Sequence, residues 1–383
     1  MKGGEAVIET LLAHGVDTAF TVPGESFLYA LEGMRRHADK IRTVSVRQEG
    51  GGAFMAEAFG KLAGRPAALF VSRGPGSSNA AIGVHTAMQD STPMLVFVGH
   101  VNSASMGRES FQEIDQRAFF GSVAKAVLAT EDVDAIPALT ADAVRLATEG
   151  RPGPVIVQIP RDVSSSDTDA AVLQPVARSD RAPEAQMIEC AAAMISTAKR
   201  PLVIAGEMIS NQDASQALTE FADAAALPVM SAYRRLDVMD NGHVCYAGHL
   251  EINRFDSQLQ TIEESDLVIA IGSRLDGITT ADDTMLSTGA PLIHIYPDRT
   301  VLDRFDSAVA IDADMKPALT ALAALLSAPD AERRARREAL HNEFLAFSQP
   351  GNFTAYGDVD LARVIDTMDR IVDQETSIIT DAG

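Results

Sequence analysis

Apolar residues follow two alternating spacings over residues 1–160. Short apolar runs that end at glycine, proline or polar residues predict strands, and they lie at 18–22, 41–46, 67–72, 94–99 and 155–159. Between them, apolar positions recur every three or four residues and predict helices that include 28–37 and 50–63. Short buried strands alternating with helices are typical of a parallel sheet covered on both faces. This segment is therefore predicted to be a doubly wound α/β domain.

The alternation resumes after a stretch rich in serine, aspartate, alanine and proline. That stretch, 166–185, has little periodicity and is predicted to be a linker between domains. Beyond it, a helical apolar face at 187–195 precedes predicted strands at 201–206, 265–272 and 291–296. The charged segment 331–347 is predicted to be a solvated helix. We therefore predict a second doubly wound α/β domain over 186–348.

A third pattern begins near the end of the sequence. Residues 349–357 are predicted to be a second linker, followed by a helix at 358–372 and a strand at 377–380. The strand leads into Asp381-Ala382-Gly383, where a ligand-binding loop of an α/β domain is expected to start. The predicted domains are thus 1–165 and 186–348, with 166–185 as linker and 349–383 as a second linker and truncated start of a third domain.

Composition and charge narrow the classes of function. Hydrophobic residues make up 46% and charged residues 22%, which allows sizeable cores, and the formal net charge is −21. Nucleic acids and anionic membranes would be repelled by such a charge, so neither is an expected partner. Two cysteines far apart, no secretory pattern and no long apolar stretch predict a cytoplasmic protein without disulfides or a membrane span.

Candidate chemistry begins at Glu49, which lies between a predicted strand and a predicted helix. Three glycines follow it at 50–52, and because each lowers helix stability, they suggest that something bulky approaches the backbone there. The alternative is that Glu49 only interacts favourably with the positive end of a helix dipole.

Two more segments could line a site. Gly74-Pro75-Gly76, with Asn79 after it, follows a buried strand; it is either a ligand-binding turn with exposed backbone N–H groups or simply a tight connection. Phe111-Gln112, followed by Glu113 and Asp115, could line a pocket or solvate a helix start.

One pattern invites a metal interpretation. His243, Cys245 and His249 are spaced like no common zinc motif and have no fourth ligand nearby in the sequence. We therefore predict no metal site here.

The order of these motifs is more specific than any one of them. Val22-Pro23-Gly24-Glu25, Arg47-Gln48-Glu49, the glycine-proline-glycine turn with Asn79, Asp90-x-x-Pro93, Phe111-Gln112-Glu113 and 150–155 succeed one another. This succession resembles the pyrimidine-binding domain of the acetolactate synthase-like enzymes, which depend on thiamine diphosphate (ThDP). The second domain resembles that family's Rossmann-like central domain, and 355–383 resembles the entry into its pyrophosphate-binding domain.

The resemblance implies a cofactor and a chemistry. It implies that Glu49 is the carboxyl group hydrogen-bonded to the cofactor's pyrimidine ring, and that desolvation raises its pKa. Phe111 and Gln112 would face the substrate, with Gln112 taking part in catalysis. Pyrimidine-binding residues would come from both turns: Pro23, Gly24, Gly74, Pro75, Gly76 and Asn79. The implied activity is a lyase or carboligase (transferase) acting on pyruvate or a similar 2-keto acid.

Further expectations concern partners and missing parts. The family holds Mg²⁺ through a Gly-Asp-Gly motif and a downstream asparagine, and this sequence has no Gly-Asp-Gly. We therefore expect the Mg²⁺ ligands in a missing domain and an inactive fragment on its own, whereas the family's cofactor geometry implies a homodimer or homotetramer. FAD is a doubtful cofactor, because 234–237 and 274–277 match the family's flavin pattern only loosely, and the sequence leaves open whether it binds. The alternatives are a ThDP-dependent decarboxylase, an acyl-CoA lyase, a non-catalytic two-domain binding or assembly protein, and a nucleotide-binding protein.

Overall fold

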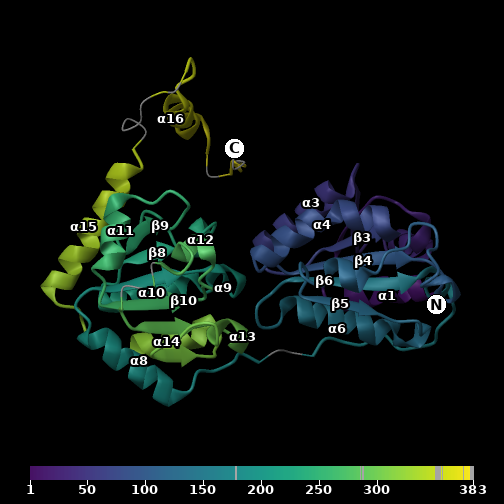
Figure 1. Ribbon diagram of the computed structural model, residues 1–383, viewed down its shortest axis with the longest axis horizontal. Helices are drawn as coiled ribbons and strands as arrows, with labels where there is room; N and C mark the ends of the chain where they lie inside the picture. The colour runs from purple at the N-terminus through teal and green to yellow at the C-terminus, as the bar shows by residue number, and fades with distance from the viewer. Residues whose placement is uncertain are drawn as a thin grey trace.

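The structure is a computed structural model, and it describes residues 1–176, 179–284, 286, 289–349, 355, 357–373 and 375–379. Two six-stranded sheets lie in succession along the chain, and the neighbouring strands of each are parallel. Figure 1 shows them as the centres of two domains, with α16 apart from both. The predicted fold class, successive doubly wound α/β domains, is confirmed.

The N-terminal sheet has the strand order β2-β1-β3-β4-β6-β5. Its strands are β1 (Thr18–Thr21), β2 (Arg42–Ser45), β3 (Ala68–Ser72), β4 (Met94–His100), β5 (Ala126–Ala129) and β6 (Pro154–Pro160). The helices of this domain are α1 (Gly3–Ala13), α2 (Leu28–Arg36), α3 (Glu49–Ala63), α4 (Arg73–Gln89), α5 (Gln116–Phe120), α6 (Ile136–Thr148) and α7 (Arg161–Ser165), with the 3-10 turns η1 (Glu25–Phe27), η2 (Ser103–Ser105) and η3 (Val133–Ala135). Apolar side chains of α1, α2 and α6 cover one face of the sheet, and those of α3 and α4 cover the other.

The second sheet has the order β12-β11-β10-β7-β8-β9. Counted within the domain, this is the 3-2-1-4-5-6 order of the Rossmann fold. The strands are β7 (Pro201–Ala205), β8 (Val229–Ser231), β9 (Tyr246–His249), β10 (Leu267–Ile271), β11 (Leu292–Ile295) and β12 (Val309–Ile311). Around them lie α8 (Ala185–Thr197), α9 (Glu207–Asn211), α10 (Ser215–Ala225), η4 (Leu236–Val238), α11 (Asp256–Glu263), α12 (Gly277–Thr280), α13 (Arg299–Leu302), α14 (Met315–Leu325) and α15 (Ala331–Phe347).

The charged helix α15 is bound to the domain more firmly than its composition suggests. His341 is its one buried residue, as expected for a solvated helix. However, Arg333 donates to the carbonyl of Ile195 across 3.1 Å, and Arg336 donates to that of Pro201 across 3.2 Å. The charged ends of these two arginines thus bind backbone carbonyl groups of the domain.

The C-terminal segment differs in part from the prediction. The helix predicted at 358–372 is found as α16 (Leu361–Ile371). The strand predicted at 377–380 is not present over 377–379, and residue 380 lies outside the described residues. Of the second predicted linker, 350–354 and 356 also lie outside them. An apolar run alone does not make a strand, because a strand needs a neighbouring strand to pair with.

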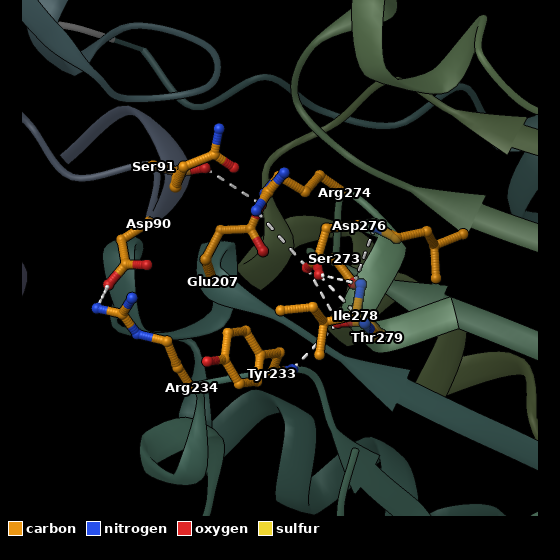
Figure 2. A network of polar contacts seen from close by, with 12 residues as sticks. Asp90, Ser91, Glu207, Tyr233, Arg234, Ser273, Arg274, Asp276, Ile278 and Thr279 are labelled. Carbon is orange, nitrogen blue, oxygen red and sulfur yellow. Dashed lines mark hydrogen bonds and ion pairs between the residues drawn. The ribbon is translucent and has the colours of Figure 1, made fainter. Parts of the chain in front are cut away.

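The two domains meet edge to edge. Asp90 and Ser91 lie just before β4, at the amino edge of the first sheet. Asp90 accepts a 2.8 Å hydrogen bond from Arg234, which follows β8 at the carboxyl edge of the second sheet. Figure 2 shows this contact beside the one between Ser91 and Glu207. These contacts therefore involve the amino edge of the first sheet and not its carboxyl edge.

Candidate active site

The predicted site residues gather at the carboxyl edge of the N-terminal sheet. In the order β2-β1-β3-β4, the connections after β1 and β3 leave toward opposite faces of the sheet. A crevice opens at such a switch point, and ligands of open α/β sheets bind there. Pro23 and Gly24 follow β1, and Gly74 to Gly76 follow β3. The fold thus brings the Pro23-Gly24 motif and the glycine-proline-glycine motif to the same edge of the sheet.

Glu49 is the first residue of α3 and is half-buried. The side chain of Asn79, on α4, donates to its Oε2 across 2.8 Å. No hydrogen bond to Oε1 is found among the described residues. The N-terminus of a helix of 15 residues favours a carboxylate here. The structure thus holds one oxygen of Glu49 in place and leaves the other for a ligand.

The three glycines after Glu49 have different causes. A Cβ atom on Gly50 would lie 2.9 Å from the carbonyl oxygen of Asn79, and one on Gly52 would lie 3.0 Å from Leu69. A Cβ on Gly51 would meet nothing within 4 Å. Our interpretation that all three accommodate an approaching ligand is therefore wrong for Gly50 and Gly52, since the chain's own close packing requires them.

The glycine-proline-glycine segment is also not the loop that the sequence suggested. Helix α4 already begins at Arg73, so Gly74, Pro75 and Gly76 form its first turn. Proline is tolerated there because the first N–H groups of a helix have no partner within it. A Cβ on Gly76 would lie 3.5 Å from Oε1 of Glu49. Gly76 therefore keeps the space beside that oxygen open.

The turn after β1 lies against the end of β3. A Cβ on Gly24 would come within 1.9 Å of Oγ of Ser72, which leaves no room for a side chain. Ser26 donates to the same hydroxyl oxygen across 3.2 Å. Pro23 and Gly24 are thus fixed beside the start of α4.

Phe111 and Gln112 reach the site from the loop after β4. The N–H of Gly74 donates to the carbonyl of Gln112 across 2.9 Å, so the backbone of this loop is attached to α4. Gln112 has a φ of +63°, an unusual value for a residue with a side chain. Phe111 is 76% exposed, which leaves a large apolar ring uncovered.

Glu113 and Asp115 support the loop. Glu113 accepts from the N–H groups of Gly107 and Ser110 at 2.6 and 3.0 Å, and these bonds lower the pKa of its carboxyl group. Asp115 caps α5 by accepting from the N–H groups of Arg117 and Ala118. Only Asp115 lies at a helix start, as the alternative expected, whereas Glu113 binds the backbone of the loop.

Arg73 is a residue of this site that the sequence analysis did not single out. It is 8% exposed, and it donates to Oε1 of Glu25 across 2.5 Å and to the carbonyl of Phe111 across 3.5 Å. Its Nε and the Nδ1 of the neighbouring His100 are buried without a hydrogen-bond partner in the described part of the chain. Burial lowers the pKa of His100. An arginine directly after a buried apolar strand was the signal available.

The metal interpretation of His243 and Cys245 gains a third group but no support. Asp223 lies with them, whereas His249 pairs instead with Glu251 at 3.4 Å. The guanidinium of Arg337 contacts both Asp223, at 3.2 Å, and the sulfur of Cys245. A cation thus already balances the carboxylate. Burial raises the pKa of Cys245 to about 12, which disfavours the thiolate that a metal needs. Another such group, Glu5, Glu9 and His37, contains a carboxylate paired with Arg36 at 2.7 Å.

Comparison with known proteins decides the family. Residues 1–119 match the family model described as the thiamine pyrophosphate enzyme N-terminal TPP binding domain, and residues 188–322 match that of the central domain. The chain belongs to the thiamine pyrophosphate enzymes. The resemblance inferred from the motif order is therefore confirmed.

Curated relatives agree with this family. The chain is 31% identical to the acetolactate synthase large subunit of Corynebacterium glutamicum over 87% of its own length and 54% of the relative's. It is 30% identical to the acetolactate synthase isozyme 1 large subunit of Escherichia coli, over 89% and 61%. To acetolactate synthase 2 of Nicotiana tabacum, which is chloroplastic, it is 28% identical over 100% and 59%. The chain therefore spans between half and two thirds of the length of these relatives.

The pyrimidine half of ThDP fits the residues at the switch point. One carboxylate oxygen of Glu49, beside Gly76, has no hydrogen-bond partner in the described part of the chain, and the other is fixed by Asn79 at 2.8 Å. Such an oxygen can accept from, or share a proton with, a ring nitrogen.

Among the described residues, no helix is long and apolar enough to cross a membrane.

Proposed function

We propose that this chain supplies the pyrimidine-binding half of a ThDP-dependent lyase or carboligase that acts on pyruvate or a similar 2-keto acid. The observation that carries the proposal is Glu49 at the switch point, with Oε2 bound to Asn79 and Oε1 without a partner among the described residues. The family membership and the names of the relatives support the cofactor and the substrate class.

Bound ThDP would supply an electron sink for the bond between the keto carbon and the carboxylate. Glu49 would share a proton with the pyrimidine ring through Oε1. Asn79 would keep the carboxylate in one orientation, so that little reorganisation is needed when the proton moves. The neighbours of Glu49 that leave space for the ring would be Pro23, Gly24, Gly74, Pro75 and Gly76.

The loop after β4 would serve the substrate side. Phe111 would cover the reacting keto acid and exclude water, and the side-chain amide of Gln112 would donate a hydrogen bond to an oxygen atom of the keto acid. The attachment of Gln112 to Gly74, at 2.9 Å, supports this placement, because it holds the loop over the start of α4.

The active form is proposed to be a homodimer or homotetramer. Four exposed apolar side chains on α3 and α4 support this: Phe54, Met55, Leu62 and Ile82. Leu62 is 89% exposed, and a second copy would remove such apolar surface from water. Light scattering after gel filtration should give a mass of at least two copies.

The test is Glu49→Gln in the native enzyme, with release of CO₂ from pyruvate as readout. We expect turnover to fall by at least two orders of magnitude, because an amide cannot share the proton. Thermal stability should change little, since the amide still accepts from Asn79. Glu9→Gln on α1 is the matched control and should keep full turnover. ThDP-dependent turnover that survives Glu49→Gln would contradict the proposal.

The acceptor is settled by a second assay. Rate saturation by a second 2-keto acid indicates a carboligase, whereas saturation by coenzyme A indicates an acyl-CoA lyase. CO₂ release that needs neither indicates a simple decarboxylase.

A further inference from the structure

The carboxyl edge of the second sheet is covered by the first domain. The side-chain amide of Asn211 donates to the carbonyl of Ser91 across 2.9 Å, and Arg235 donates to the carbonyl of Asp90 across 2.7 Å. Figure 2 shows Asp90 and Ser91 facing Glu207 and Arg234 across this boundary. The turn before β4 is therefore bound through its backbone as well as its side chains.

The covered edge is where a Rossmann-type sheet binds dinucleotides. Its switch point lies between β7 and β10, and the phosphates bind to free N–H groups in the first turn after β7. Here two N–H groups of that turn bind carbonyl groups at the end of β10: Gly206 donates to the carbonyl of Ile271, and Met208 donates to that of Gly272, both across 2.9 Å. The following helix, α9, has only 5 residues.

The turn after β7, where a dinucleotide phosphate would be expected, carries an acidic side chain. Glu207 is the first residue of α9 and is 5% exposed. Its Oε1 accepts from the hydroxyl of Tyr296 at 2.9 Å and from that of Ser91 at 3.4 Å. Ser91 in turn accepts from Arg151 at 2.9 Å. The carboxylate of Glu207 thus already binds a partner from each domain, Tyr296 and Ser91, and a diphosphate bound at this turn would have to separate them.

The room at this edge is also small for a dinucleotide. A Cβ on Gly206 would lie 2.4 Å from Cα of Ser273, so the two strand ends are in direct contact. In the part of the chain that the structure describes, a cavity lined by residues of both domains, among them Pro93, Met208 and Asn211, has a volume of about 110 Å³. Pockets for drug-sized ligands have volumes of about 300–1,000 Å³, and FAD is larger than such ligands.

We propose that the N-terminal domain docks at the switch point of the central domain through contacts around Glu207, and that the central domain therefore binds no FAD or other dinucleotide. The Rossmann strand order is kept, but its binding edge holds a protein domain. This inference goes beyond the proposed function and does not depend on Glu49, so either can fail alone.

The first experiment is equilibrium dialysis of the full chain against FAD and, separately, against ADP. Less than one tenth of a molar equivalent should be retained at 100 μM ligand. This concentration is well above the dissociation constants expected for tightly bound cofactors. Stoichiometric retention of FAD, or of ADP as the adenosine diphosphate part that dinucleotides share, would overturn the exclusion of dinucleotides.

The second experiment is hydrogen exchange on the full chain and on Glu207→Ala. Amides of 90–92 and of 206–212 should both exchange at least tenfold faster in the variant, because the contact between Ser91 and Glu207 joins the two segments. Glu220→Ala, an exposed acid on α10 of the same domain, is the matched control and should change neither segment. Faster exchange confined to 206–212 would contradict the docking role. If Glu207→Ala does not fold, Tyr296→Phe removes one donor to the carboxylate and should show the same paired increase.

Discussion

Asn79 and Glu49 join two neighbouring helices through one hydrogen bond, in which the amide of Asn79 donates to Oε2 across 2.8 Å. The bond is exposed enough that it contributes little to folding, so its expected role is to orient the carboxylate.

We predict that Asn79→Ala weakens ThDP binding by the native enzyme about tenfold, since a hydrogen bond to a charged group is worth roughly 1.5–3 kcal/mol and water can replace part of it. Titration calorimetry with ThDP measures this. Asn102→Ala, at a position whose side chain makes no capping hydrogen bond, is the control. Equal affinities of the two variants would remove the orienting role.

The adjacent glycines Gly50 and Gly51 should respond in opposite directions. Gly51→Ala adds a methyl group in open space on a helix and should stabilise the fold by up to about 1 kcal/mol. Gly50→Ala places a methyl group 2.9 Å from the carbonyl oxygen of Asn79 and should destabilise it by about 1–3 kcal/mol. Urea unfolding followed by circular dichroism measures both. Similar effects at the two positions would contradict the packing argument.

Arg73 should act as the support of the loop that carries Phe111. Its guanidinium binds Glu25 and the carbonyl of Phe111 together, a geometry that the single amine of lysine cannot reproduce. We predict that Arg73→Lys raises KM for the keto acid more than it lowers kcat, and speeds hydrogen exchange of 108–112. Arg117→Lys, on the exposed part of α5, is the control. A fall in kcat with unchanged KM and exchange would assign Arg73 to the chemistry instead.

His294 should make the protein sensitive to acid. Burial lowers its pKa from 6.5 to about 4, and its Nε2 donates to the carbonyl of Ser273 across 2.8 Å. Between pH 6.5 and pH 4 the unfolded chain therefore binds a proton that the folded chain does not, so stability falls as the pH falls. The loss is on the order of 3 kcal/mol.

The check is urea unfolding of the wild type and His294→Phe at several pH values. The variant is expected to be less stable at pH 7, because the Ser273 carbonyl loses its donor, but to lose less stability toward pH 4. Parallel pH profiles would show that His294 is not the source.

Asp90 should matter to the domain contact more than an ordinary surface acid. Its side chain is 8% exposed and accepts from Lys61 at 2.9 Å and from Arg234 at 2.8 Å. We predict that Asp90→Asn lowers the free energy of unfolding by about 1–3 kcal/mol. The loss is smaller than that from breaking a fully buried ion pair, because water can still partly solvate both cations. Asp142→Asn, an exposed partner of Arg145, should cost less than about 0.5 kcal/mol. Thermal melts of the two variants compare them directly.

Long apolar runs were readable from the sequence because both faces of a parallel strand are buried. The strand predicted at 94–99 is found as β4 (Met94–His100), every residue of which is buried. The edge strand β5 (Ala126–Ala129) was missed, since its side chains are mostly only half-buried and leave a weak pattern. The strand predicted at 377–380 failed for the complementary reason, that an apolar run has no strand geometry without a partner.

The sequence by itself determined the fold class, the motif order and the family, because these depend on burial and turn chemistry that are local along the chain. Only the tertiary structure brought Asn79 to Glu49 and Arg73 to Glu25, assigned Gly50 to packing, and placed Glu207 against Ser91. The physical reason is that these contacts join residues from 29 to 116 positions apart, as in the pair Ser91 and Glu207, where |i−j| is 116. Their distances follow from strand order and domain docking, which no local pattern encodes.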